Sequence, residues 1–362
     1  MKFSLLASAL VAATVSAAPS FPLLKGNAVA ARSHHSSTAS SRTASATGSA
    51  ATGSGSSSSS DGSSSSSSAS VTDVADIGYA TQNGGTSGGA NGTQTTVSSL
   101  EDLKSAASAD GAAIIIIDGE ITGSDKVDIT SDKTIIGAAG SSLNGIGLRV
   151  KKQSNVIIRN VKISKVLADN GDAITIQASN NVWIDHADLS SDRDHDKDYY
   201  DGLLDVTHGS DYVTISNTYF HDHWKGSLVG HSDNNGDEDK GHLIVTYANN
   251  YWSNINSRGP SFRFGTGHIY NSYAQNASTG VNVRDGAQLL IESTVFSDVP
   301  KAIESADSDT VGYAVVNDVD LGSGTNTVDA GTLTSVPYSY SLLGSANVKA
   351  SVQANAGQTL SF

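Results

Sequence analysis

Short runs of valine and isoleucine recur along the chain from about Val71 onward, with Asn, Asp and Gly between them. Apolar triplets such as Val-Ile-Ile are followed by alternating residues such as Val-Lys-Ile, which is the pattern of short strands with one buried face. Only Leu100–Ala109 has the spacing of a short helix. The segments that look alike are Lys133–Gly137, Asn155–Ile163, Asn181–Leu189, Tyr212–Phe220, His242–Tyr251 and Gln288–Phe296.

These segments return at a nearly regular interval. Successive starts lie 22 to 31 residues apart, at Lys133, Asn155, Asn181, Tyr212 and His242. Self-similarity at that period indicates stacked repeats, in which each coil buries its neighbours. A leucine-rich horseshoe has the same period, but its Leu-x-x-Leu-x-Leu frame is absent, and a two-sheet sandwich remains an alternative on periodicity alone. Once the motifs below are added to the periodicity, the sequence predicts an all-β chain folded as a right-handed, single-stranded parallel β-helix.

The part of the chain before Val71 has a different character. A basic Lys2, an apolar run over Phe3–Val15 and small residues at 16–18 predict a cleaved secretory signal peptide over residues 1–18. The following Ser- and Thr-rich tract cannot bury enough apolar surface to offset its ordering entropy. We therefore expect a propeptide and disordered linker over residues 19–70 and the functional domain over 71–362. No later apolar stretch is long enough to cross a bilayer, so we expect no membrane span.

Composition narrows the chemistry. The chain has no cysteine, which excludes a thiol nucleophile and leaves oxygen or imidazole as the ligands for any metal. Its formal net charge of −14 argues against nucleic acid as a partner, because phosphate binding requires a basic face. The same charge is unfavourable for an acidic polysaccharide, unless a bound divalent cation and a local cluster of Lys and Arg offset it.

One acidic set stands out, formed by Asp172, Asp201 and Asp205, with Asp169 and Asn170 nearby. Asp172 precedes one strand, and the other two acids flank Gly-Leu-Leu at the start of the next coil. Residues at matching positions of stacked coils lie about 4.8 Å apart, and carboxylates that close repel each other unless they are protonated or bridged by a cation. Ca²⁺ takes several oxygen ligands and tolerates irregular geometry. Composition alone, however, favours solvated loop acids.

A basic set follows along the chain, formed by Lys225, Arg258 and Arg263. The stretch Arg258-Gly-Pro-Ser-Phe-Arg263 places two guanidinium groups on either side of a rigid proline. Such a patch could bind the carboxylates of a uronic acid polymer bidentately. Taken by itself, the set is more typical of surface charges paired with Asp and Glu.

Two loops imitate the start of an EF-hand, Asp192–Asp198 and Asp233–Asp239. Neither has glycine at the sixth loop position, and Leu203 and Ile244 stand where the twelfth position requires glutamate. We therefore interpret both as solvated loops beside a cleft. Histidines are numerous but form no helical metal pair. His221 and His223 would lie on one face of a strand, which leaves a transition-metal site as an alternative. We assign hydrogen-bonding roles to His186, His221, His223, His231, His242 and His268.

Together these residues resemble the extracellular pectate and pectin lyases, most closely the fungal pectate lyases. The resemblance extends over about Ile77–Leu343, and the order and spacing of its parts are specific although no single part is. The matching stretches are Gly78–Thr86, Thr134–Gly137, Val182–His186, Asp201–Asp205, Phe220–Lys225 and Arg258–Gly265.

The resemblance implies a secreted, monomeric lyase that cleaves polygalacturonate by β-elimination, without nucleic acid or membrane partners. It places Asp172, Asp201 and Asp205 on the family's Ca²⁺ ligands. Lys225 and Arg263 fall on substrate-binding positions, and Arg258 falls on the catalytic base. Relatives that act on methylated pectin generally carry Arg in place of the acidic set, so its presence favours pectate.

Three other functions remain in view. A pectin lyase would share the fold and the elimination but not the need for calcium. A hydrolase would need paired carboxylates as acid and base or nucleophile, whereas here the carboxylates cluster as ligands. A non-catalytic wall-binding β-helix would retain binding without cleavage. The sequence also contains two N-glycosylation sequons, at Asn91 and Asn276.

Overall fold

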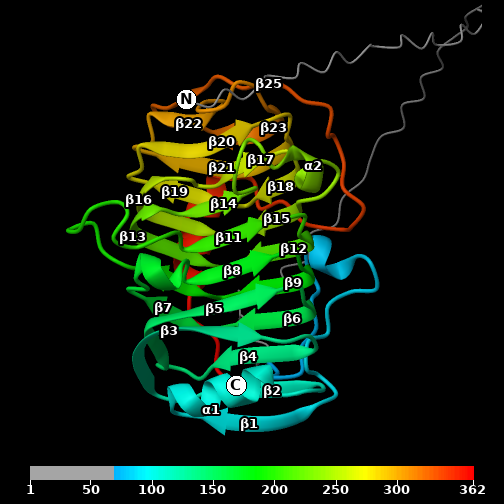
Figure 1. Cartoon of the computed structure of the whole chain (residues 1–362). Coiled ribbons are helices and arrows are strands. Elements are labelled where there is room, and N and C mark those ends of the chain that lie inside the picture. Colours follow the sequence, from blue (N-terminus) through cyan, green and yellow to red (C-terminus); the bar gives the residue numbers. More distant parts are fainter. Residues whose placement is uncertain (1–68) are drawn as a thin grey trace, which may run out of the picture. The chain divides into compact units, whose positions relative to one another are not determined.

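Short parallel strands, stacked coil upon coil, form most of the computed structural model, which describes residues 69–362 (Figure 1). The predicted signal peptide and nearly all of the predicted linker lie outside the described residues, and the division at residue 70 stays a prediction. The predicted parallel β-helix is confirmed, because each strand pairs in parallel with its counterparts in the coils before and after it. The horseshoe and sandwich alternatives are wrong.

The strands form three parallel ladders, here called ladders 1, 2 and 3, and the longest strands turn a corner to join two of them. Ladder 1 contains β1 (Thr93–Val97), β2 (Ala113–Ile117), β4 (Lys133–Gly137), β6 (Ser154–Arg159), β9 (Asn180–Asp185), β12 (Asp211–Ser216), β15 (Ile244–Ala248), β18 (Thr266–Tyr270), β21 (Gln288–Ser297), β23 (Tyr313–Asp320) and β25 (Asp329–Ala330). Ladder 2 contains β3 (Glu120–Ile129), β5 (Ser142–Lys151), β8 (Ile174–Gln177), β11 (Leu204–Thr207), β14 (Ser227–Val229), β17 (Ser261–Arg263), β20 (Thr279–Arg284), β22 (Lys301–Glu304) and β24 (Thr325–Asn326). Ladder 3 runs from β5 to β21 through β7 (Lys162–Ser164), β10 (Asp188–Ser190), β13 (Tyr219–Lys225), β16 (Tyr251–Ser257) and β19 (Tyr273–Gln275).

Asparagines recur between the apolar runs of the sequence because they occupy one corner of successive coils. The residue that follows each central strand of ladder 1 has a left-handed backbone, with φ between 48° and 58°. Asn and His adopt this conformation more readily than most residues, and the Asn160 side chain also donates to the Gly137 carbonyl at 2.8 Å. The corner residues are Asn160, His186, Asn217, Asn249 and Asn271.

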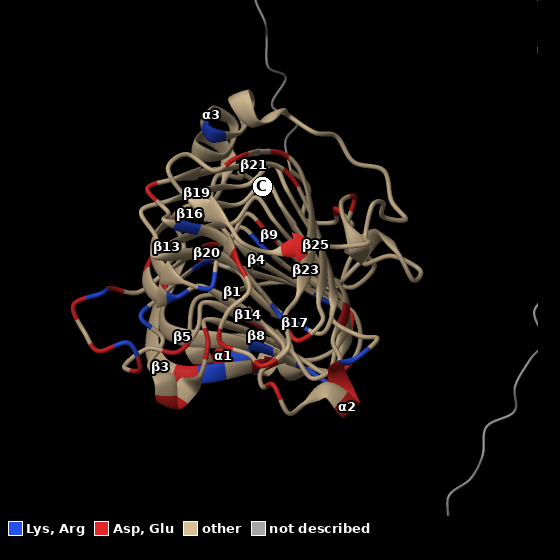
Figure 2. Cartoon of the chain, turned by 90° about the horizontal axis from the view of Figure 1, so that it is seen from above, with Lys and Arg blue, Asp and Glu red and all other residues tan. Residues whose placement is uncertain are grey.

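Inside the coils, apolar side chains stack in register. Ile158, Ile184 and Ile215 are successive Cα partners in ladder 1, each with no solvent exposure, and Tyr247 continues the row. Viewed along the stack, charged residues lie mostly on the outer turns and loops (Figure 2). Burial of this continuous apolar row supplies the main favourable term in folding.

Replacing Ile215 with alanine should destabilise the protein by about 2–5 kcal/mol, because it leaves a cavity in a row that cannot collapse from either side. Denaturant unfolding measures the change. Leu342→Ala is the matched control, because Leu342 is 45% exposed and its removal should change the free energy of unfolding by less than about 0.5 kcal/mol. Equal effects of the two substitutions would contradict the register of the interior row.

The helices lie outside the coils. The predicted helix is confirmed as α1 (Leu100–Ser108), where Ser99 caps the N-terminus by accepting from the Asp102 amide at 3.1 Å. The short helical segments are two 3₁₀ helices, η1 (Tyr79–Thr81) and η2 (Ala168–Asn170), and the one-turn α2 (Gly236–Asp239). Among residues 69–362, no helix has the length and apolar character that crossing a membrane requires. Both sequon asparagines, Asn91 and Asn276, are exposed.

A second longer helix, α3 (Ser345–Asn355), was not predicted from the sequence, which indicated only one helix. Its buried residues are Val348 and Val352, which pack with Tyr273. Two valines among small and polar residues do not form an apolar stripe that periodicity detects. The helix is therefore stabilised by its contact with the β-helix rather than by its own pattern.

Candidate active site

A cleft of about 290 Å³ lies beside ladder 2, where loops from ladder 3 approach it. Four of its lining residues are basic although the chain as a whole is acidic, and two of them, Lys225 and Arg258, belong to the basic set named from the sequence. Its charged lining residues are Lys197, Lys225, Arg258 and Arg284 on the basic side and Asp198, Glu304 and Asp307 on the acidic side.

Two of the three predicted metal-ligating acids meet around a glycine. Asp172 Oδ1 accepts from the Gly202 amide at 3.1 Å, and Asp205 Oδ1 accepts from the Leu228 amide at 3.0 Å. A Cβ atom placed on Gly202 would lie 2.7 Å from Asp205 Oδ1 and 2.9 Å from Asp172 Oδ1. Residue 202 thus has no room for a side chain, and the absence of one lets the two carboxylates converge.

The sequence predicts that these acids occupy matching positions of stacked coils, but in the structure Asp172 and Asp205 do not. In the register of β8 against β11, Asp205 pairs with Thr175, and Asp172 falls opposite Gly202. The acids converge because Asp172 comes before its strand while Asp205 lies within the next one. Stacking of like residues therefore does not explain the pair.

Burial makes this pair of charges unfavourable by itself. Both acids are only 7% exposed. Desolvation and the charge of Asp201 raise the pKa of Asp172 above its ordinary value of 3.8. Desolvation and then Asp172 raise the pKa of Asp205 well above that value, although the Arg258 charge opposes the shift. Two buried carboxylates that disfavour ionisation in each other's presence suit a bound cation, and their oxygen donors suit Ca²⁺.

The third acid, Asp201, has a different partner. Its carboxylate lies 3.2 Å from Lys225 Nζ, which also contacts Asp198 at 3.2 Å. Within residues 69–362, no three His, Asp or Glu side chains are gathered closely enough to form a complete set of metal ligands. The structure thus brings Asp172 and Asp205 together and leaves Asp201 beside them, in an ion pair with the basic set.

Arg258 follows β16 directly and has a left-handed backbone with φ 65°. That conformation is costly for a long side chain and persists only where the surroundings enforce it. Its carbonyl accepts from the Ser227 amide at 2.8 Å, and the amide of the next residue, Gly259, donates to Gly280 at 2.9 Å. Both neighbouring coils therefore hold this turn in place, with Arg258 at the cleft.

Arg263 does not line the cleft; its neighbour Arg284 does. The two are Cα partners in β17 and β20. Arg263 Nε lies 2.6 Å from Asp233 and 3.4 Å from Asp285, and its Nη1 donates to the Gly230 carbonyl at 2.8 Å. Arg284 was not predicted from the sequence, because the unequal spacing of the coils does not show which residues of neighbouring coils pair.

The sequence assigns His223 only a hydrogen-bonding role, and in the structure this residue contacts the backbone of Asp201. The ring is 1% exposed, and its Nε2 lies 2.5 Å from the Asp201 carbonyl. Burial lowers the pKa of His223 to about 4. The ring is therefore neutral at higher pH and donates from Nε2, which fixes the backbone that carries Asp201.

Of the two loops that imitate an EF-hand, the first lies beside the cleft, and the second contacts the cleft-lining Arg284 through Asp233. Lys197 and Asp198 of the first loop line the cleft, while Asp233 of the second pairs with Arg263. Arg193 anchors the first loop by lying over the Trp224 ring at 4.6 Å.

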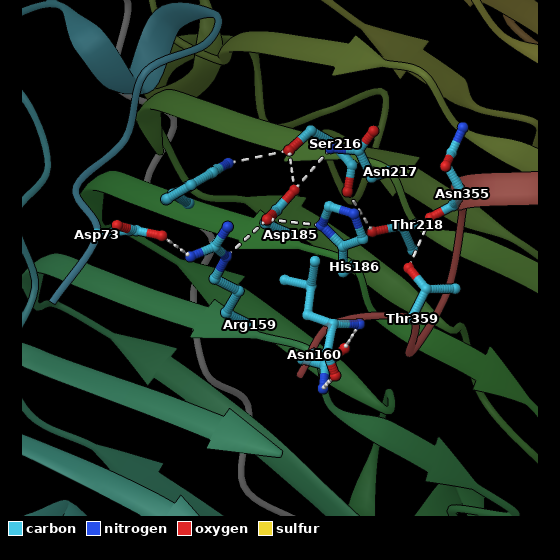
Figure 3. A network of polar contacts seen from close by, with 12 residues as sticks. Asp73, Arg159, Asn160, Asp185, His186, Ser216, Asn217, Thr218, Asn355 and Thr359 are labelled. Atoms are coloured by element: carbon cyan, nitrogen blue, oxygen red, sulfur yellow. Dashed lines mark hydrogen bonds and ion pairs between the residues drawn. The ribbon is translucent and has the colours of Figure 1, made fainter. Parts of the chain in front are cut away.

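A second buried charge network belongs to a different region, at the ladder 1 corner (Figure 3). Asp185 is 1% exposed and accepts from Arg159 and from Ser216, each at 2.8 Å. Burial raises its pKa, but hydrogen bonds from His186 and Asn217 and the Arg159 charge outweigh burial, so the net pKa is below its ordinary value. Arg159 also pairs with Asp73 at 2.7 Å, which fastens the segment before the first coil to the stack.

Comparisons with known proteins show which family this chain resembles. A family model described as pectate lyase matches residues 28–361. The chain is 63% identical over 295 residues to a probable pectate lyase A of Aspergillus niger, covering 81% of this chain and 90% of that protein. It is 60% identical to pectate lyase B of Colletotrichum gloeosporioides, covering 81% and 88%. A pectate lyase from Bacillus sp. N165, solved with trigalacturonate, is similar at a TM-score of 0.71 and 30% identity, covering 78% of this chain and 98% of that one.

Proposed function

This chain belongs to the pectate lyase family and is a polysaccharide lyase that acts by β-elimination, and from this premise we propose that it is a secreted, calcium-dependent lyase of polygalacturonate. The observation that carries the proposal is the pair of buried carboxylates converging on Gly202 beside a basic cleft. A basic cleft alone would attract an acidic polymer, but only the carboxylate pair gives a reason for calcium.

In this proposal Asp172, Asp201 and Asp205 hold the ion. Asp172 and Asp205 already converge, and Asp201 joins them from its pair with Lys225. When bound, Ca²⁺ would neutralise substrate carboxylate and stabilise the negative charge that develops during elimination. The same charge would offset the desolvation and the repulsion that raise the pKa of both buried acids.

Lys225 and Arg263 are proposed to bind the substrate, and Arg258 to be the catalytic base. The proton on C5 of a galacturonate lies α to the carboxylate, so its removal builds up charge that nearby cations stabilise. Arg258 would take this proton, and the C4 oxygen would leave to give an unsaturated uronide end. Arginine is normally protonated, so we expect this base to depend on the surrounding positive charge, including Lys225, and the reaction to be fastest at alkaline pH.

The decisive measurement is the growth of unsaturated uronide absorbance on polygalacturonate at alkaline pH. The signal should stop with a chelator and resume when Ca²⁺ is added back. Activity indifferent to chelation and greater on methylated pectin would instead identify a pectin lyase. Reducing ends that appear without absorbance would mean hydrolysis and would exclude elimination.

A further inference from the structure

A loop over residues 230–241 follows β14 of ladder 2 and contacts the two buried arginines. Its α2 turn lies on the same side of the stack as β17 and is strongly acidic (Figure 2). Glu238 anchors one end of the loop through His208 at 2.8 Å. Near the other end, Asp233 Oδ1 lies 2.6 Å from Arg263 Nε and 3.1 Å from Arg284 Nη2. One carboxylate oxygen therefore serves both guanidinium groups.

Asp233 lies on the solvent side of these arginines. Its side chain is 44% exposed, whereas those of Arg263 and Arg284 are each 10% exposed. Burial raises the pKa of Asp233, but hydrogen bonds from Arg263 and Ser308 outweigh burial and keep the net pKa below the ordinary value of 3.8. The loop thus places an ionised carboxylate between solvent and the arginine pair.

Asp233 is the carboxylate that contacts both arginines. Asp285, which is 8% exposed, lies 3.4 Å from Arg263. The charge of Asp307 acts on Arg284, but its contact with that arginine is made by its backbone carbonyl. If Asp233 moved away, the pair would lose its shared carboxylate contact. A single incoming carboxylate would restore that contact.

We propose that Asp233 is an internal competitor of the substrate, a carboxylate that occupies the Arg263–Arg284 pair until a galacturonate carboxylate displaces it. A uronate carries the same functional group as Asp233, so the exchange replaces one charge-assisted contact with another. The loop therefore lowers the affinity of this part of the cleft. A substrate carboxylate that displaces Asp233 contributes only the difference in free energy between its own contact with the arginines and the Asp233 contact. The inference rests on the proposed function, which assigns Arg263 to substrate binding.

The test measures equilibrium binding of hexagalacturonate, in the presence of Ca²⁺, to a chain carrying Arg258→Ala so that cleavage does not interfere. In that background Asp233→Asn should lower the Kd by about tenfold, since a neutral amide competes poorly with a carboxylate for a guanidinium. Asp237→Asn is the matched control: it removes the same charge from an exposed site on the same loop that pairs with neither arginine. It should change the Kd by less than about twofold, an effect of overall charge alone.

Asp233→Glu retains the charge and should bind within about threefold of the background chain, which separates competition from mere disturbance of the loop. Thermal unfolding of each variant identifies loss of fold, and Asp233→Ser supplies a second neutral substitution. An unchanged or higher Kd in both neutral variants would overturn the inference and make Asp233 a positioning residue for the arginines. Failure of the background chain itself to bind hexagalacturonate would overturn the proposed function and this inference together.

Discussion

Arg258→Ala should lower kcat on polygalacturonate by about 10³-fold, the scale expected when a positioned proton-transfer group is removed. The turn that carries Arg258 is held by backbone hydrogen bonds to both neighbouring coils, so the fold should persist without the side chain. Binding should persist as well, because Lys225 and Arg284 still line the cleft. Initial rates of unsaturated uronide formation, with the Kd for hexagalacturonate, measure the two effects separately.

Two variants make this result specific. Arg258→Lys retains a positive charge but not the guanidinium, and its kcat should stay reduced by about 10²-fold if proton transfer, rather than charge alone, is what was lost. Arg149→Ala removes an arginine that pairs with Asp128 on ladder 2 and does not line the cleft, and it should leave kcat within about twofold of the parent. Arg258→Ala activity above about a tenth of the parent would exclude the base assignment.

Asp205→Asn should lower activity by about 10²-fold and remove its stimulation by Ca²⁺, because the pair around Gly202 loses one of its two carboxylates. Asparagine keeps an oxygen for the Leu228 amide, so the substitution tests charge rather than shape. Calcium titration of activity and of thermal stability measures both consequences.

The same variant should be more stable than the parent when a chelator is present. Desolvation and the Asp172 charge raise the pKa of Asp205, so the folded parent binds protons more tightly than the unfolded chain. Its stability should therefore rise as the pH falls toward 3.8, and Asp205→Asn should lose most of this pH dependence. Calcium should stabilise the parent and not the variant.

Asp128→Asn is the control for this stability effect. A hydrogen bond from Arg149 lowers the pKa of Asp128, so its charge is favoured in the folded state. Its neutralisation should slightly destabilise the chelated protein, opposite in sign to Asp205→Asn. A chelated Asp205→Asn protein less stable than the parent would show that the buried pair is not a source of repulsion.

The sequence by itself predicted the solenoid, although its periodicity alone left a two-sheet sandwich open. Period-two alternation within strands and the regular return of similar segments are local signals, and stacked coils satisfy both at once. The α1 helix could also be predicted, because its serine cap and buried positions lie within one short segment. The acidic and basic sets could also be named from the sequence, because their residues are clusters of like charge along the chain.

Only the tertiary structure decided which of these charges meet. The loops between strands differ in length, so the coil register could not be read from the period. That register places Asp172 opposite Gly202 rather than opposite an acid. It also places Arg284 beside Arg263, while a loop excursion brings Asp233 onto both. The α3 helix belongs here too, since its two valines need Tyr273 from a distant coil to be buried.

The physical reason is one of range. Strand pattern and helix capping depend on neighbours within a few positions, which the sequence displays directly. Pairing of charges depends on desolvation and on distances between coils, and both are set only when the coils stack on one another. Gly202 illustrates the difference: along the chain it is one glycine among 36, and in the fold it is the place where a side chain would separate two buried carboxylates.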